Sequence, residues 1–167
     1  MTLDAKHNSH EDSPIETRVQ KLADLTPSEH LDRHAAHERF VKDFGAFIPF
    51  AFYLGFELDR FEGGESVLSY TPTPDHFNSL EMTHGGALMT LMDVAMACAA
   101  RSVAPTLRVV TIELKSTFFS PASGALQAKG YLIHRSSKMA FVEAKVYDAQ
   151  QVLCAHGTGT FRYVTPR

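Results

Sequence analysis

One acidic residue, Asp93, interrupts a run from Ala87 to Ala100 that is otherwise almost wholly apolar. A buried carboxylate costs several kcal/mol unless it is paired or hydrogen-bonded. Asp93 could be a structural acid with its hydrogen bonds satisfied, or an acid that faces solvent. It could also be a general base or nucleophile, because a largely apolar pocket is how such a carboxylate is tuned.

A glycine doublet, Gly85-Gly86, comes directly before this run. Glycines bring no side chain to the first turn of a helix, so the free backbone N–H groups there are open to a ligand. Together with the helix macrodipole, these groups suit a partly negative oxygen, and Gly85 could act as an oxyanion donor. The alternative is that the doublet only permits a tight turn into the helix.

The spacing of these residues constrains any shared chemistry. Gly85 and Asp93 are eight residues apart, which is about 12 Å along a helix axis. A base and an oxyanion donor must both come within about 3 Å of one reacting group. One helix with a short aspartate cannot easily do this, but two antiparallel copies can. We therefore expect any active site to be shared across a symmetric homodimer.

The elements that position these residues follow from the hydrophobic pattern. Residues 84–102 predict one helix that is apolar nearly all round and therefore enclosed by other structure. Four strand-like runs follow it, joined by short polar connections that favour an antiparallel meander. These runs are residues 107–119, 125–134, 139–148 and 152–164.

Two further patterns concern the strands. The stretch from Phe50 to Thr73 predicts a β-hairpin around Glu62-Gly63-Gly64-Glu65. In the run 107–119, simple alternation places Val110, Ile112, Leu114 and Phe118 on one face and Val109, Thr111, Glu113, Lys115 and Thr117 on the other. The predicted fold is α+β, with one long helix laid on one curved antiparallel sheet.

The chain divides into three regions. Residues 1–14 are polar and predict a disordered N-terminus. Residues 15–45 predict a helical extension, in which Thr26-Pro27-Ser28-Glu29 has the pattern of a helix start, with Thr26 as its cap. Residues 46–167 form the predicted main domain.

Composition excludes several classes of protein. Hydrophobic residues make up 44% and charged residues 21% of the 167, and the net charge of −3 gives no electrostatic reason to expect nucleic acid. Cys98 and Cys154 both lie in apolar contexts, which fits a reducing compartment. With no signal-peptide pattern and no apolar stretch of membrane-spanning length, we expect a cytoplasmic protein that does not enter a membrane.

The order Asn78, His84-Gly85-Gly86 and Asp93 resembles the hotdog-fold acyl-CoA thioesterases, in the subgroup of the phenylacetate-pathway enzymes and the "thioesterase superfamily member" enzymes. The resemblance continues into VVTIELKSTFFSPASG and covers roughly residues 47–164. It implies a hotdog fold, in which a sheet of about five to six strands wraps around one central helix. It also implies sites built from two subunits.

The resemblance assigns four catalytic roles. Asp93 would be the general base or nucleophile, and the backbone N–H of Gly85 would bind the thioester carbonyl oxygen. Asn78 would help to hold the carbonyl or the attacking water, and Thr111 would position that water. Glu81 departs from the family, which often has glycine there, and glutamate is strained if the position needs positive φ.

Substrate contacts are expected at two places. His84 and Gly86 lie at the turn into the helix, where His84 has a structural or orienting role. Arg135, Ser137 and Lys138 lie in a strand connection and could meet the phosphates of a CoA tail. The alternative for the two basic residues is simple solvation, as is usual for exposed turns.

The leading hypothesis is a thioesterase that hydrolyses an acyl-CoA to a free acid and CoA without a metal or organic cofactor. The alternative is a non-catalytic acyl-CoA-binding hotdog module, against which the acid at position 93 argues. A hotdog dehydratase is a third possibility, but the catalytic histidine motif of those families is not found. The pattern leaves open whether two dimers pair into a tetramer.

Overall fold

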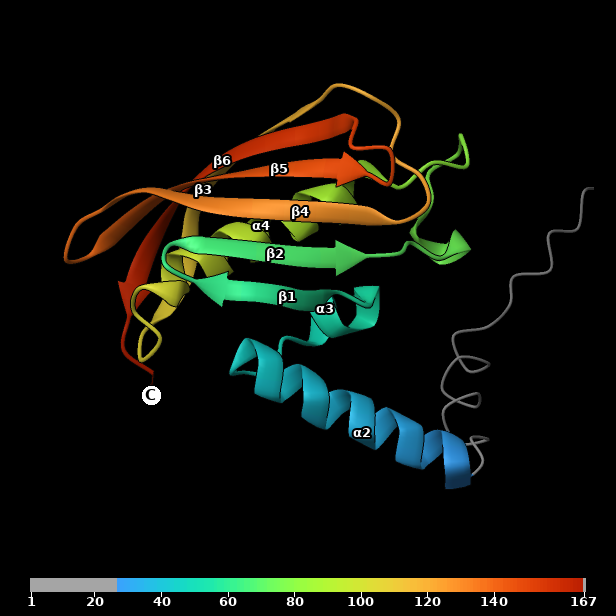
Figure 1. The fold of residues 1–167 in the computed structure, drawn as a ribbon, viewed down its shortest axis with the longest axis horizontal. Coiled ribbons are helices and arrows are strands. Elements are labelled where there is room, and N and C mark those ends of the chain that lie inside the picture. Colours follow the sequence, from blue (N-terminus) through green and yellow to red (C-terminus); the bar gives the residue numbers. More distant parts are fainter. Residues whose placement is uncertain (1–26, 167) are drawn as a thin grey trace, which may run out of the picture. The chain divides into compact units, whose positions relative to one another are not determined.

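The computed structural model describes residues 27–166 (Figure 1). Among the described residues, those from Arg39 onward form one compact unit, distinct from the residues before it. Helix α2 is described from Pro27 to Phe44, within the predicted helical extension. The predicted cap Thr26, the disordered region 1–14 and the helical residues 15–26 lie outside the described residues.

Six strands form one sheet in the order β1-β2-β4-β5-β6-β3, and every neighbouring pair is antiparallel. The last four strands lie within one residue of their predicted bounds. The strands are β1 (Glu57–Glu62), β2 (Glu65–Tyr70), β3 (Arg108–Phe118), β4 (Leu126–Arg135), β5 (Met139–Asp148) and β6 (Leu153–Val164).

The predicted meander is correct only for β4, β5 and β6. Strand β3 pairs with β6 at one edge of the sheet, and β4 pairs with β2. Because helix α4 lies between β2 and β3 in the chain, it carries the chain across the face of the sheet, and β3 enters at the far edge. Residues 119–125 then return the chain to β2. A short connection therefore joins strands that are not neighbours.

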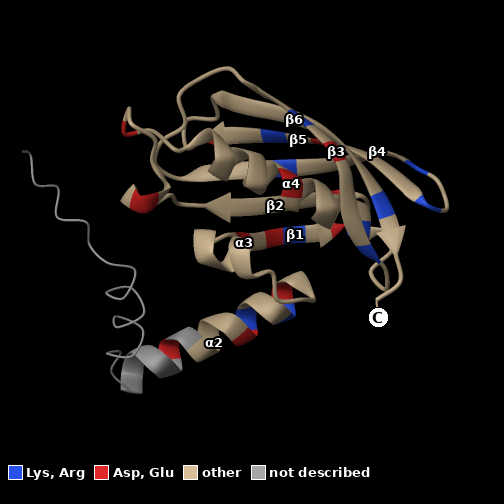
Figure 2. Ribbon diagram, turned by 180° about the vertical axis from the view of Figure 1, so that it is seen from behind, with Lys and Arg blue, Asp and Glu red and all other residues tan. Residues whose placement is uncertain are grey.

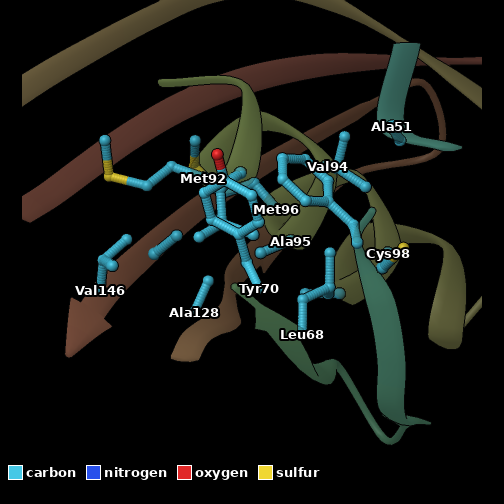
Figure 3. Packing of buried hydrophobic residues seen from close by; sticks show 14 of the residues in the cluster. Ala51, Leu68, Tyr70, Met92, Val94, Ala95, Met96, Cys98, Ala128 and Val146 are labelled. Carbon is cyan, nitrogen blue, oxygen red and sulfur yellow. The ribbon is translucent and has the colours of Figure 1, made fainter. Parts of the chain in front are cut away.

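Helix α4 (Gly85–Ser102) lies against the sheet and contacts all six strands, as the hotdog resemblance predicts. Figure 3 shows side chains of α4, among them Met92 and Met96, packed with Leu68 and Tyr70 of β2. Small residues of the sheet allow this close packing. A Cβ atom at Gly130 of β4 would lie 2.6 Å from the backbone oxygen of Ala95.

The prediction of a strand from Phe50 is wrong for its first residues, which form helix α3 (Pro49–Leu54). Pro49 begins this helix and Gly55 ends it in the left-handed conformation, with φ of 75°. Ala51 and Leu54, three residues apart, are buried on one side. The aromatic residues favour a strand locally, but the proline and the glycine fix a short helix.

The predicted hairpin itself is confirmed by β1 and β2. Gly63 and Gly64 join them with φ of 61° and 87°, the two positive values that a tight two-residue hairpin turn requires. After β2, a short 3-10 helix, η1 (Pro74–His76), leads toward the start of α4.

The predicted faces of β3 are also wrong, because the strand contains a β-bulge. Thr111 pairs with Phe161 and Glu113 pairs with Thr160, so Ile112 is an extra residue. Alternation therefore reverses at Ile112. Thr111 reaches α4 from one side of the bulge, and Leu114 packs on the core from the other. Within residues 27–166, no helix is long and apolar enough to cross a membrane.

Candidate active site

Asp93 lies in the middle of α4, on the side that faces β3, and its side chain is half-buried. Figure 2 shows α4 with uncharged residues over most of its length. The hydroxyl of Thr111 donates a hydrogen bond of 2.8 Å to Oδ1 of Asp93. Burial raises the pKa of Asp93 above its ordinary value, and this hydrogen bond lowers it in part.

The bulge at Ile112 explains how Thr111 reaches the acid. Val109 packs against the core, and Thr111, two residues further along β3, points to the same side. The bulge then lets the strand continue with Leu114 on that side. The structure thus brings together the predicted base or nucleophile and the residue predicted to position water.

The N-terminus of α4 is organised by His84. Its Nδ1 atom accepts a 2.8 Å hydrogen bond from the backbone N–H of Gly86, so the expectation that this N–H is open to a ligand is wrong. The backbone oxygen of His84 accepts from Ala87 and Leu88. Gly85 differs, because its N–H has no acceptor among the described residues. This leaves Gly85 as the donor available to a ligand.

Asn78 lies in the loop before α4 and holds that loop in place. Its Oδ1 accepts hydrogen bonds from the backbone N–H groups of Leu80, at 2.8 Å, and Met82, at 3.3 Å. Its side-chain NH₂ has no partner among the described residues and could donate to a substrate oxygen. Glu81 has φ of 58°, which confirms the strain expected there.

A pocket of about 330 Å³ opens at this end of α4. Asn78 and Gly85 line it, together with apolar side chains that include Leu88 and Phe118. Neither Asp93 nor Thr111 lines it. One chain therefore carries the candidate oxyanion donor and the carboxylate at two separate places along α4, as their spacing predicts.

The predicted phosphate contacts lie at the β4–β5 connection. The Arg135 guanidinium donates to the backbone oxygen of Val103 at 3.1 Å and lies over the ring of Tyr163, 5.0 Å from its centre. It therefore secures the residue that follows α4. Ser137 and Lys138 are exposed, and the backbone N–H of Lys138 donates to Ser136. None of the three predicted residues lines the pocket beside Gly85.

Two residues at this end of α4 were not predicted from the sequence. Phe118 covers the start of the helix, since a Cβ atom at Gly85 would lie 3.5 Å from its ring. His76 ties η1 to α4, because its backbone oxygen accepts from His84 N–H at 2.8 Å. Its Nδ1 also lies within hydrogen-bond distance of the buried Tyr70 hydroxyl, at 3.0 Å. Of the two, only Phe118 could have been suspected from the sequence, because it belongs to the apolar pair Phe118-Phe119 at the end of β3.

The chain is similar to several known proteins. Residues 80–155 match the family model of the thioesterase superfamily. A protein of Saccharolobus solfataricus, provisionally named as an esterase, is 27% identical over 110 residues, which are 65% of this chain and 73% of that protein.

Solved structures share the fold. A conserved protein of Pseudomonas aeruginosa superimposes with a TM-score of 0.68 at 26% identity, over 71% of this chain and 95% of that one. The PaaI protein of the E. coli phenylacetic acid degradation operon has the same TM-score at 23% identity, over 78% and 94%. The enclosed helix and six-stranded antiparallel sheet are the hotdog fold. Within that fold, the match to the family model over residues 80–155 and the similarity to these relatives are consistent with the thioesterase superfamily and support a hydrolase of the thioesterase type.

Proposed function

We propose that this protein is an acyl-CoA thioesterase whose active site is built from two subunits. The observation that supports this most directly is the separation of the two half-sites on α4. A free backbone donor lies at the start of the helix, and a hydrogen-bonded carboxylate with a raised pKa lies eight residues later. Each half supplies what the other lacks.

A second copy could supply the missing half through the edge of the sheet. Strand β3 is an edge strand, and two of its apolar side chains are exposed, Val110 at 46% and Ile112 at 57%. An exposed apolar edge strand is a surface that proteins usually cover. If two copies met along β3 in antiparallel fashion, the N-terminal end of one α4 would approach the middle of the other. That is the geometry that the spacing of Gly85 and Asp93 requires.

In the proposed reaction, the thioester carbonyl oxygen accepts hydrogen bonds from Gly85 N–H and the side-chain NH₂ of Asn78. Both donors stabilise the negative charge that develops on this oxygen as the carbonyl carbon becomes tetrahedral. The carbon–sulfur bond then breaks, the thiolate of CoA takes up a proton, and the acid is released.

Asp93 of the other subunit acts in one of two ways. As a general base, its carboxylate removes a proton from water while the oxygen of that water attacks the thioester carbon. As a nucleophile, the carboxylate attacks the carbon itself, and water then cleaves the resulting anhydride. In both cases the anionic form is active. The hydroxyl of Thr111 holds that carboxylate in position.

The direct test is hydrolysis by the purified protein, measured with short, medium, long and aromatic acyl-CoA substrates. We expect at least one class to be cleaved, and we expect Asp93→Asn to lower kcat by about 10²-fold or more, as loss of a base or nucleophile does. Asparagine is nearly isosteric, so the dimer and the fold should persist and can be checked by sedimentation and circular dichroism.

The same experiment separates the alternative function. A non-catalytic acyl-CoA-binding module would bind these compounds without cleaving any of them, and Asp93→Asn would leave its affinity nearly unchanged. Absence of turnover across the whole panel, with binding intact, would therefore favour the binding module over the thioesterase.

A further inference from the structure

A second pocket, of about 540 Å³, lies at the opposite end of α4 from Gly85. Three basic residues line it, namely Lys42 near the end of α2, Arg101 in the last turn of α4, and Arg108 at the start of β3. One acidic residue, Asp43, also lines it. Figure 2 shows basic residues on this side of the domain, near the start of β3 and the C-terminus.

Arg101 is buried to an unusual degree for an arginine, with 7% of its surface exposed. One NH₂ group of its guanidinium donates to the backbone oxygen of Phe44 at 3.0 Å, and the group lies over the ring of Phe61 at 5.6 Å. The remaining NH₂ group would lie 3.3 Å from a Cβ atom at Gly45. The Nε atom is buried and has no hydrogen-bond partner among the described residues.

The positive charge of this pocket is not balanced. Arg108 donates to the backbone oxygen of Gly45 at 3.0 Å. Asp43 lies 3.7 Å from Arg39, one turn earlier on α2. Among the described residues, no carboxylate forms an ion pair with Lys42, Arg101 or Arg108. Burying a charge that has no counterion is strongly unfavourable.

The electrostatics of Arg101 point the same way. Burial lowers the pKa of Arg101, and the nearby charge of Arg108 lowers it further, while Cys98 acts in the opposite direction. A bound anion would offset both the burial and the repulsion. The carbonyls at the end of α2 account for one hydrogen bond from each arginine. Among the described residues, they leave Nε of Arg101 and the ammonium of Lys42 without a partner.

We propose that this pocket binds a phosphate group of a phosphorylated organic molecule. Because Asp43 also faces Arg39, the three basic residues leave an excess of at least two positive charges, which suits a phosphate dianion. Guanidinium groups suit phosphate because they present several donors in a fixed fork. The pocket is larger than a single ion needs, and Phe61 and Pro105 line it and offer apolar contacts to an organic portion.

The test is the binding of pyrophosphate to the full chain, followed by titration calorimetry at constant ionic strength. We expect saturable binding that Arg108→Gln weakens about tenfold, a change of about 1.4 kcal/mol, and that Lys42→Gln weakens less because Lys42 is exposed. Arg162→Gln is the matched control, since Arg162 is exposed on β6 and does not line the pocket. No saturable binding, or an equal loss in the control variant, would overturn the proposal.

Arg108 and Lys42 are preferred for this test because Arg101 holds the end of α2, and its replacement could unfold that region. Circular dichroism confirms that each variant is folded before it is titrated. Asp93→Asn should bind pyrophosphate as the wild type does. Pyrophosphate binding therefore tests the phosphate site independently of the proposed hydrolysis.

The phosphate could belong to the CoA portion of the substrate or to a separate molecule. Arg101 is eight residues beyond Asp93, about 12 Å further along the axis, so the pocket is within reach of a long substrate bound at that acid. If CoA supplies the phosphate, Arg108→Gln should raise KM for an acyl-CoA but not for the matching acyl-pantetheine. If a separate molecule supplies it, neither KM should change. Only this comparison of KM values rests on the proposed thioesterase activity.

Discussion

The start and the middle of α4 carry the two halves of the candidate site, but they are built in different ways. At the start, the functional group is the backbone N–H of Gly85, which is free because no side chain and no earlier turn supplies an acceptor. In the middle, it is the side chain of Asp93, which needs the Thr111 hydroxyl to offset part of the cost of burial.

This difference determines how each half can fail. A backbone donor stays in place when its side chain changes, so only steric crowding or a distorted turn can disable it. A half-buried carboxylate can be removed by a single nearly isosteric substitution such as Asp93→Asn. Its pKa also depends on the burial and hydrogen bonds that its neighbours provide. The two halves therefore call for different kinds of variant, and the expected effects differ in size.

The largest effect is expected when the two halves are disabled in different subunits. Gly85→Val should crowd the carbonyl site, because a Cβ atom there already approaches the ring of Phe118 to 3.5 Å. Gly85→Val and Asp93→Asn homodimers should each lose about 10²-fold or more of the activity, since both of their sites contain one defect. A mixed dimer has one site with two intact halves and should recover about half of the wild-type rate.

Co-expressed subunits with different affinity tags allow the mixed dimer to be isolated and assayed. Sedimentation must first show that Gly85→Val still dimerises. If proven heterodimers remained inactive, each subunit would have to carry a complete site, and the division of the site between two subunits would be wrong.

The sequence was a good guide to the elements but a poorer guide to their neighbours. The apolar residues of α4 and the turn residues between strands act locally, so the bounds of the helix and of four strands could be predicted. The pairing of β3 with β6 depends on the edge of the sheet at which α4 ends and β3 begins. That position is set by tertiary packing and not by local sequence. Likewise, the bulge at Ile112 satisfies the packing of the whole sheet, and simple alternation cannot reveal it.

The candidate site shows the same division. The resemblance implied that Thr111 positions water beside Asp93, and the structure places the two side chains in direct contact, 2.8 Å apart. The use of Gly86 N–H by His84 could not be read from the sequence, because it depends on the rotamer of one side chain. The burial of Arg101 could not be read from the sequence either, since an arginine at a helix end usually faces solvent.

The next effect concerns Thr111, which holds the carboxylate. Thr111→Ala should lower kcat by about tenfold, less than Asp93→Asn, because the base or nucleophile remains. The hydroxyl lowers the pKa of Asp93 by stabilising its anion, so its loss should raise that pKa. The acid limb of the pH–rate profile should therefore move to higher pH.

Thr111→Ser retains the hydroxyl and serves as the control, with a nearly normal rate and an unshifted profile. A Thr111→Ala enzyme that loses activity equally at every pH would show that Thr111 acts on the water or the substrate and not through the charge of Asp93. A loss as large as that of Asp93→Asn would give Thr111 a chemical role of its own.

A smaller effect should distinguish the two glycines at the start of α4. Alanine at Gly85 makes only ordinary contact with Phe118 and keeps the N–H, so Gly85→Ala should lower kcat by a factor of about three or less. Alanine at Gly86 would place its Cβ atom 3.1 Å from Nδ1 of His84, which would disturb the helix cap. Loss of a cap costs about 1 kcal/mol.

Thermal unfolding and acyl-CoA hydrolysis, measured side by side, check this pair. Gly86→Ala should unfold at a lower temperature than Gly85→Ala. The opposite order would mean that His84 does not stabilise the start of the helix.

The smallest effect is on stability and concerns the charge of Asp93. Because burial raises its pKa in the folded protein, the folded state binds this proton more tightly than the unfolded chain does. Stability from this group is therefore present at low pH and declines as pH rises from the unfolded pKa to the folded pKa. Asp93→Asn carries no charge at any pH. It should match the stability of the wild type in acid, where Asp93 is protonated, and exceed it at neutral pH by about 1 kcal/mol or less, within the usual range of single substitutions.

Urea unfolding of both proteins at a series of pH values measures the difference in stability. An Asp93→Asn variant that is less stable than the wild type at neutral pH would show that the carboxylate is a net stabilising group. The charged half of the site would then carry no cost in stability, and in this respect it would not differ from the uncharged donor at the start of α4.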